Sequence, residues 1–162
     1  MRICRFDQNR IGVVQGEMVH DVTSILGRLG KRGYPFPQHD LLIAALPELL
    51  PEMQALADQT SGVPISKIAF DAPVANPGKL LAAPVNYNDH LKEAEDDLIE
   101  YFQQKIMQIH KVGFFLKATS SLIGESEAIQ LRVEDRRNDH ELELVAVIGK
   151  RASNVPAEKA LD

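Results

Sequence analysis

The sequence predicts an α+β fold with a small N-terminal α+β domain, residues 1–70, followed by the start of a second domain over residues 76–162. Three observations lead to this prediction. Short apolar stretches of strand length alternate with turn residues near the N-terminus, and one later block carries apolar residues at helical spacing. Turn-forming residues then crowd residues 60–78, which is typical of a domain boundary.

The first elements are expected to be short strands. Residues 2–6 and 10–15 flank the segment Asp7-Gln8-Asn9, whose side chains can bond their own backbone in a tight turn. Gly16-Glu17 allows a second turn, which leads into residues 18–20. These residues predict three consecutive strands.

Helices follow in the pattern. Asp21 or Thr23 can cap a short helix that ends near Gly30. Residues 39–59 have apolar residues at helical spacing, and Pro47 and Pro51 are expected to split them into two helices. We expect this part of the chain to be scaffold.

In the second domain, residues 79–83, 113–117 and 141–148 are expected to be strands of one sheet system, with Val145 and Val147 buried. Residues 89–110 are polar and show helical spacing. Residues 154–158 read as the start of a helix, and because the sequence stops soon afterwards we expect it to be a piece of a longer protein.

Composition excludes several classes of protein. Apolar residues make up 44% and charged residues 25%, the balance of a globular protein. The net charge is −5, and Arg136 and Arg137 lie among acidic residues, so no nucleic-acid partner is expected. Cys4 is the single cysteine, which suits a reducing cytoplasm, and no apolar run is long enough for a membrane span. The sequence therefore predicts a soluble, cytoplasmic protein.

The clearest chemical pattern is a pair of carboxylates, Glu141 and Glu143, at the start of an apolar strand. Alternate residues of a strand share one face, so the two side chains are ~7 Å apart along the strand and can converge on one cation. Carboxylate oxygens favour a hard cation such as Mg²⁺. The alternative is a solvated, charged strand end.

A second pattern is His90 followed by Glu93. If Asn88 or Asp89 caps a helix, both side chains lie on one face. A carboxylate beside an imidazole fixes its tautomer and raises its basicity, which suits proton abstraction from water. The alternative is a surface histidine with an accidental neighbour.

A third pattern is Lys117 at the end of an apolar strand, followed by small hydroxyl residues that include Ser120. A lysine here can hold a substrate carboxylate, with a serine hydroxyl assisting. The alternative is that Lys117 is only the polar end of its strand.

Together, three segments resemble the fumarylacetoacetate hydrolase family. Residues 76–90 read Asn-Pro-Gly-Lys-Leu-Leu-Ala-Ala-Pro-Val-Asn-Tyr-Asn-Asp-His, and residues 114–124 read Phe-Phe-Leu-Lys-Ala-Thr-Ser-Ser-Leu-Ile-Gly. Residues 139–150 read Asp-His-Glu-Leu-Glu-Leu-Val-Ala-Val-Ile-Gly-Lys. Each motif alone is weak, but their order along residues 76–162 is specific.

The resemblance implies a mixed β-sandwich roll after the small domain, usually in a homodimer. It implies that Glu141 and Glu143 bind a divalent metal, Mg²⁺ in the first place with Ca²⁺ or Mn²⁺ as alternatives. It also implies that His90 and Glu93 transfer protons on a segment that acts as a lid. The family's third metal carboxylate and its basic oxyanion residue fall beyond residue 162.

The implied function is a metal-dependent hydrolase that cleaves a carbon–carbon bond in a β-diketo or 2-oxo acid during breakdown of aromatic compounds. We expect Tyr87, Lys117 and Ser120 to contact the substrate. One alternative is an isomerase or decarboxylase of 2-hydroxy-diene or 2-oxo dicarboxylic acids. An alternative of another class is a catalytically incomplete fragment or binding module.

Overall fold

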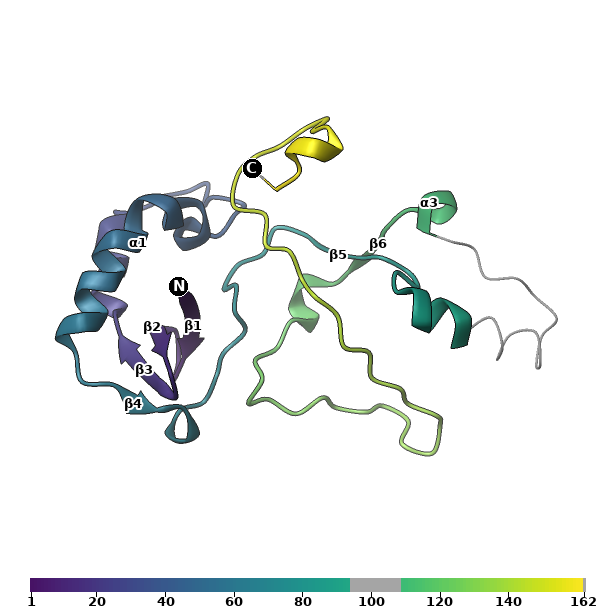
Figure 1. The fold of residues 1–162 in the computed structure, drawn as a ribbon, viewed down its shortest axis with the longest axis horizontal. Helices are drawn as coiled ribbons and strands as arrows, with labels where there is room; N and C mark the ends of the chain where they lie inside the picture. The colour runs from purple at the N-terminus through teal and green to yellow at the C-terminus, as the bar shows by residue number, and fades with distance from the viewer. Residues whose placement is uncertain (94–108, 162) are drawn as a thin grey trace. The chain divides into compact units, whose positions relative to one another are not determined.

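The structure is a computed structural model that describes residues 1–93 and 109–161. The chain divides into two compact units, residues 76–122 on the one hand and residues 1–75 with 123–162 on the other. Figure 1 follows the elements along the chain. The fold is α+β, as expected. The domain boundary inferred from the sequence, between residues 70 and 76, stays a prediction.

An antiparallel sheet forms the centre of the first unit, in the order β1-β2-β3-β4. The strands are β1 (Arg2–Phe6), β2 (Arg10–Gln15), β3 (Met18–Asp21) and the short β4 (Val63–Pro64). The three strands predicted near the N-terminus are thus confirmed, because each short apolar stretch can pair with the next across a tight turn.

The turn between β1 and β2 has an unusual backbone. Asp7, Gln8 and Asn9 all have positive φ, at 41°, 66° and 75°. The Asp7 carboxylate accepts from the Ala69 N–H at 2.8 Å, and the Asn9 N–H donates to the Asp71 carboxylate at 2.8 Å. These bonds offset the cost of the left-handed backbone and tie the turn to residues 69–71.

A 3-10 helix, η1 (Thr23–Leu29), follows β3 and ends at Gly30, whose φ is 67°. The Asp21 carboxylate accepts from the Thr23 N–H at 2.9 Å. The short helix ending near Gly30 is confirmed, but its N-cap residue is Val22, without a side-chain cap bond, and not Asp21 or Thr23. Gly30 takes the positive-φ position that ends the helix.

The long helix α1 (Leu41–Gln59) corrects one prediction, because Pro47 and Pro51 lie inside it and do not split it. Each interior proline removes a backbone hydrogen bond and costs about 3 kcal/mol. The helix continues because its buried residues span both prolines, so packing holds the two parts in line. These buried residues are Leu42, Leu49, Met53 and Ala57.

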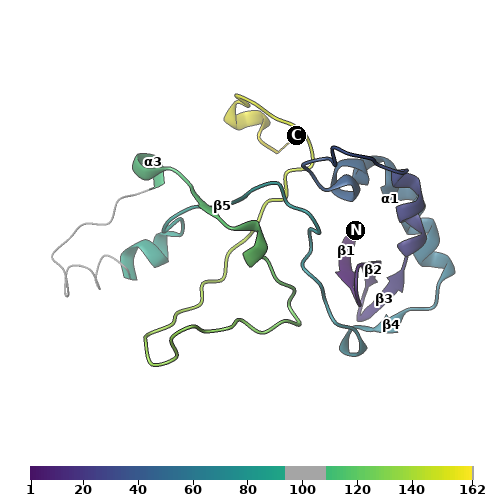
Figure 2. The same ribbon diagram turned by 180° about the vertical axis from the view of Figure 1, so that it is seen from behind.

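The core of this unit lies where α1 and η1 cover one face of the sheet (Figures 1 and 2). Met53 is fully buried, and Ile25 and Val13 are 1% exposed. Cys4 on β1 is half buried, and burial raises the pKa of its thiol to about 11, although a backbone hydrogen bond from Gly12 lowers it. A raised pKa keeps the thiol protonated near neutral pH, which disfavours the reactive thiolate.

The second unit contains a two-stranded antiparallel sheet of β5 (Leu80–Ala82) and β6 (Phe115–Lys117). These strands confirm two of the three expected in the second domain. A helix begins at residue 88, and α3 (Ile109–Val112) precedes β6. Most of the expected polar helix, and of the expected lid, lies at residues 94–108, outside the described residues.

The third expected strand is absent from the structure, which corrects that prediction. Residues 141–148 form no strand, and Val145 and Val147 are 74% and 49% exposed instead of buried. A strand forms only when a neighbouring strand accepts its hydrogen bonds, and within residues 1–93 and 109–161 no strand pairs with this stretch. The apolar pattern therefore indicates a segment that is able to form a strand but that has no neighbouring strand to pair with among the described residues.

Three further single turns of 3-10 helix complete the described chain: η2 (Ile65–Lys67), η3 (Thr119–Ser121) and η4 (Ala157–Lys159). The last one agrees with the helix start expected near residues 154–158. Among the described residues, none of the helices has the length and apolar character needed to span a membrane.

Candidate functional site

The histidine–glutamate pair lies on a helix that begins at residue 88, a few residues after the end of β5 at Ala82. Val85 has a positive φ of 45°, which turns the chain away from the strand before the helix begins at residue 88. The Leu91 N–H donates to the Tyr87 carbonyl oxygen at 2.9 Å and closes the first helical turn. Asn88 and Asp89 therefore lie inside the helix and not at its cap.

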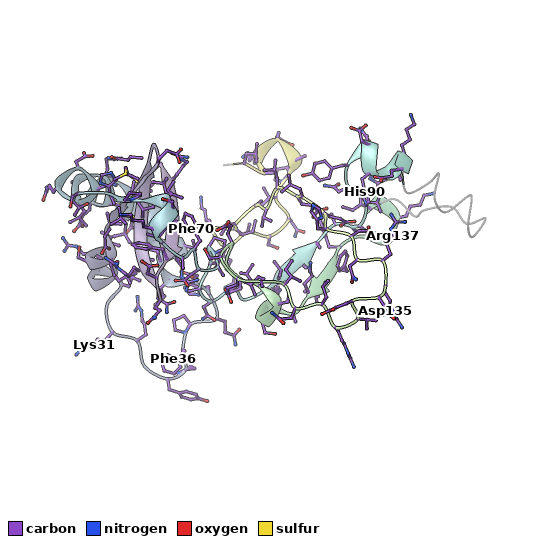
Figure 3. All side chains as sticks on the ribbon, turned by 90° about the horizontal axis from the view of Figure 1, so that it is seen from below. Lys31, Phe36, Phe70, His90, Asp135 and Arg137 are labelled. Atoms are coloured by element: carbon purple, nitrogen blue, oxygen red, sulfur yellow. The ribbon has the colours of Figure 1, made fainter. Side chains whose placement is uncertain are left out.

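Within this turn, His90 Nδ1 lies 4.0 Å from Glu93 Oε2 (His90 is labelled in Figure 3). The His90 side chain is 37% exposed and that of Glu93 is 73% exposed. At this distance the two groups attract each other when His90 is protonated, and a change of rotamer can bring them into hydrogen-bond contact. The arrangement is compatible with proton transfer, whereas the catalytic role of both residues stays a prediction.

The predicted substrate contacts lie in the same unit. The register pairs Ala82 with Phe115 and Leu80 with Lys117, so Lys117 lies at the end of the ribbon away from the turn to His90. Ser120 is exposed in the η3 turn. The neighbouring Ser121 hydroxyl donates to the Ala118 carbonyl oxygen at 2.7 Å, so Ser121 and not Ser120 holds that turn.

The predicted metal ligands, Glu141 and Glu143, lie in the other unit, on the exposed stretch without a strand. Because the strand is not formed, the shared face that would align their carboxylates is not formed either. An exposed ion pair precedes them, in which Arg137 Nε lies 2.8 Å from Asp139 Oδ2 (Arg137 is labelled in Figure 3).

The donor chemistry of this carboxylate pair fits a hard divalent cation, since all the ligand atoms are oxygen. The set is incomplete, however. The described part of the chain contains no group of three or more His, Cys, Asp or Glu side chains that could hold a metal ion. Two carboxylates leave most positions around Mg²⁺ to water, substrate oxygens or additional residues.

Sequence reasoning missed a contact that lies close to these motifs. The Phe70 N–H donates to the Ser126 hydroxyl at 2.8 Å, and Gly124 is buried against the backbone of Phe70 and Asp71. The only indication of this contact in the sequence was Gly-Glu-Ser after the Lys117 motif. This tripeptide predicts a turn, but it does not reveal a partner 56 residues earlier.

Comparison with known proteins connects these motifs to one family. The family model described as fumarylacetoacetate hydrolase C-terminal matches residues 79–162. A maleylpyruvate hydrolase of Aquipseudomonas alcaligenes is 46% identical over 100% of this chain and 57% of its own length. A mitochondrial oxaloacetate tautomerase of Homo sapiens is 32% identical over 67% of this chain and 31% of its own length.

One similar solved structure is the maleylpyruvate hydrolase of Sphingobium sp. SYK-6 in complex with manganese(II) and pyruvate. It is 28% identical, with a TM-score of 0.48, over 72% of this chain and 36% of that one. The chain thus spans little more than half the length of the relative from Aquipseudomonas alcaligenes, and about a third of the others. The match to the family model covers more than half of the sequence, and the chain belongs to the fumarylacetoacetate hydrolase family.

Proposed function

We propose that the full protein is a metal-dependent hydrolase that cleaves a carbon–carbon bond in an acylpyruvate-type 2-oxo acid, as part of the breakdown of aromatic compounds. The observation that carries the proposal is 46% identity to a maleylpyruvate hydrolase along the entire chain. The proximity of His90 and Glu93 adds support from geometry, because hydrolysis requires a base for water.

In the proposed reaction, His90 removes a proton from water, and the Glu93 carboxylate orients the imidazole and stabilises its protonated form. The water attacks the acyl carbonyl carbon, and the bond between that carbon and the neighbouring methylene breaks. The methylene carbon leaves as the enolate of pyruvate and takes up the proton that His90 removed from the water, so the products are the acid of the acyl group and pyruvate. Lys117 neutralises the substrate carboxylate, and Tyr87 and Ser120 donate hydrogen bonds to its oxygens.

Glu141 and Glu143 would hold the metal, and Mg²⁺ is the cation that we propose, with Ca²⁺ or Mn²⁺ as alternatives. When bound, such a cation supplies Lewis-acid polarisation of the 2-oxo group and stabilises the developing enolate charge. The all-oxygen chemistry of the two carboxylates supports a hard cation. We further propose a cytoplasmic homodimer, by resemblance to the family.

A second candidate is a keto–enol tautomerase. It is favoured by one observation, the 32% identity to an oxaloacetate tautomerase over two thirds of this chain. Hydrolysis and tautomerisation both need a polarised 2-oxo group and a base, so the motifs alone do not distinguish them.

The test uses the purified full-length protein with Mg²⁺, with maleylpyruvate and oxaloacetate as separate substrates. Product analysis by NMR is expected to show pyruvate and maleate from maleylpyruvate, with a rate that disappears on EDTA treatment and returns with Mg²⁺. Accelerated keto–enol exchange of oxaloacetate, without cleavage of maleylpyruvate, would replace the hydrolase by the tautomerase. No reaction with either substrate would favour a binding module.

A further inference from the structure

A small set of contacts joins two parts of the first unit that are far apart in sequence. We call it the clasp and define it as residues 69–71 together with residues 124–127. Its central bond is the one from the Phe70 N–H to the Ser126 hydroxyl at 2.8 Å (Phe70 is labelled in Figure 3). The Ser126 hydroxyl in turn donates to the Glu125 carboxylate at 3.2 Å.

The turn that carries Ser126 is held from within. The Gly124 N–H donates to a carboxylate oxygen of Glu127 at 2.7 Å, and the Glu127 N–H donates to the Gly124 carbonyl oxygen at 3.1 Å. Residues 124–127 therefore form a closed turn with two reciprocal bonds. Such a turn presents the Ser126 hydroxyl in a set orientation.

The fit between the two sides of the clasp requires glycine at position 124. A Cβ atom on Gly124 would lie 2.1 Å from the carbonyl oxygen of Phe70 and 2.7 Å from the carbonyl carbon of Asp71. Both are backbone atoms, so no rotamer change can relieve the overlap. Gly124 is also the buried residue of this turn.

The other side of the clasp is anchored to the small sheet. The Asp7 N–H donates to the Ala69 carbonyl oxygen at 2.9 Å, and the Asp71 N–H donates to the Arg5 carbonyl oxygen at 3.0 Å. Phe6 and Phe70 also form an antiparallel bridge. Residues 69–71 therefore extend the edge of the sheet beside β1, and the clasp attaches the later turn to that edge.

The position of the clasp in the sequence suggests its purpose. It joins Phe70 to Ser126, 56 positions further along the chain, and the loop between them contains His90, Glu93 and Lys117, with Tyr87 and Ser120. All the residues that we assign to proton transfer and substrate contact therefore lie between its two sides. Closing a loop removes conformational freedom from the unfolded chain within it, so the described residues of the loop, 71–93 and 109–125, lose less entropy when they become ordered.

We propose that the clasp positions the loop between Phe70 and Ser126, which carries His90 and Glu93. Gly124 and Ser126 are then positioning residues that act through the clasp. The catalytic part of this inference rests on the proposed function, whereas the ordering of the loop does not. Neither residue contacts substrate in this proposal. They hold the ends of the loop so that its own side chains meet the substrate in one arrangement.

The experiment compares variants of the full-length protein by amide hydrogen exchange, thermal unfolding and steady-state kinetics. Ser126→Ala removes the acceptor for the Phe70 N–H, and Ser126→Thr restores a hydroxyl. Gly124→Ala separates the two backbones. The matched controls are Ser61→Ala, at an exposed serine, and Gly33→Ala, where an added Cβ meets no atom within 4 Å.

In Ser126→Ala we expect the hydrogen-exchange rate of the Phe70 amide to rise about five- to tenfold. This is the factor by which losing the net stabilisation of one hydrogen bond favours local opening. Gly124→Ala should also raise exchange of the Leu91 amide, whose bond to Tyr87 lies within the loop. KM should rise in both variants without a matching fall in Tm, and Ser126→Thr should recover the original KM.

Each result has a separate meaning. Unchanged exchange at Phe70 in Ser126→Ala would overturn the clasp itself. A second outcome is that exchange at Phe70 rises in Ser126→Ala, while exchange at Leu91 in Gly124→Ala and KM in both variants match the controls. That outcome would keep the contact but overturn its positioning role. If the parent protein turns over no substrate, the proposed function fails, and exchange at Leu91 in Gly124→Ala still decides whether the clasp orders the loop.

Discussion

His90 Nδ1 and Glu93 Oε2 lie 4.0 Å apart on one face of a helical turn that begins at residue 88, after the turn that follows β5. This proximity follows from the spacing of the two positions in the sequence, because residues at i and i+3 are neighbours on a helix. It makes the pair the part of the proposed site that can be tested most directly.

Loss of the His90 imidazole is expected to lower kcat of the full-length enzyme about 10²–10⁴-fold, the usual contribution of a general base. Glu93→Gln should cost less, because the amide keeps a hydrogen-bonding group and loses only the charge. Steady-state kinetics with maleylpyruvate measure both effects, and calorimetry should show unchanged Mg²⁺ binding. His39→Ala, at an exposed histidine, is the control. Near-normal kcat in His90→Ala would assign water activation to another residue.

Removal of either carboxylate, in Glu141→Ala or Glu143→Ala, is expected to weaken Mg²⁺ binding to the full-length protein at least tenfold. Even residues that only orient metal ligands contribute about 10–100-fold to affinity, and a direct ligand should contribute no less. Isothermal titration calorimetry gives the affinities, with the exposed Glu158→Ala as the control for a lost surface charge. Parent-like affinity in both variants would exclude this pair as the metal site.

Pro51→Ala should stabilise the protein, because it supplies the N–H that is missing inside α1 and can donate to the Pro47 carbonyl oxygen. The expected gain is about 1–3 kcal/mol, the cost of an interior proline reduced by the greater freedom of the unfolded alanine variant. Urea denaturation measures the change.

A destabilising substitution in the same helix provides the reference for this measurement. Met53 is fully buried, so Met53→Ala should destabilise by about 2–5 kcal/mol through the lost burial and the cavity that remains. If Pro51→Ala lowers the denaturation midpoint instead, the helix depends on a bend at this proline that outweighs the additional hydrogen bond.

The environment of Asp21 leads us to expect that the free energy of unfolding depends on pH. Partial burial raises its pKa, but hydrogen bonds from the Thr23 hydroxyl and N–H, together with Arg10, outweigh burial and leave the pKa of Asp21 below its usual value. A carboxyl whose pKa is lower in the folded state adds stability above the pKa of the unfolded state, about 3.9. That stability is lost as the pH falls through the lower folded value.

Thermal unfolding between about pH 2 and pH 7 tests this sign. Asp21→Asn should be less stable than the parent near neutral pH, and the difference should shrink as the pH falls below about 4. The exposed Asp135→Asn is the matched control. A difference in stability that stays constant across this range would mean that the Asp21 charge does not contribute.

Local pattern alone determined much about this protein. The β1–β2 hairpin, β3 and the η1 turn ending at Gly30 follow from short apolar stretches and turn residues, because each pairs or folds with its sequence neighbours. The motifs around His90, Lys117 and Glu141 are enough to indicate the family, since side-chain chemistry in a given order is a property of sequence.

Only the tertiary structure decided the features that depend on distant partners. Helix α1 runs through two prolines because the core packs along its whole buried face, a gain that no local rule contains. Residues 141–148 have the pattern of a strand and form none, because pairing needs a neighbouring strand that the described chain does not provide. The clasp was likewise invisible in sequence, since it depends on a hydrogen bond between residues 56 positions apart and on the close approach of Gly124 to the backbone of Phe70 and Asp71.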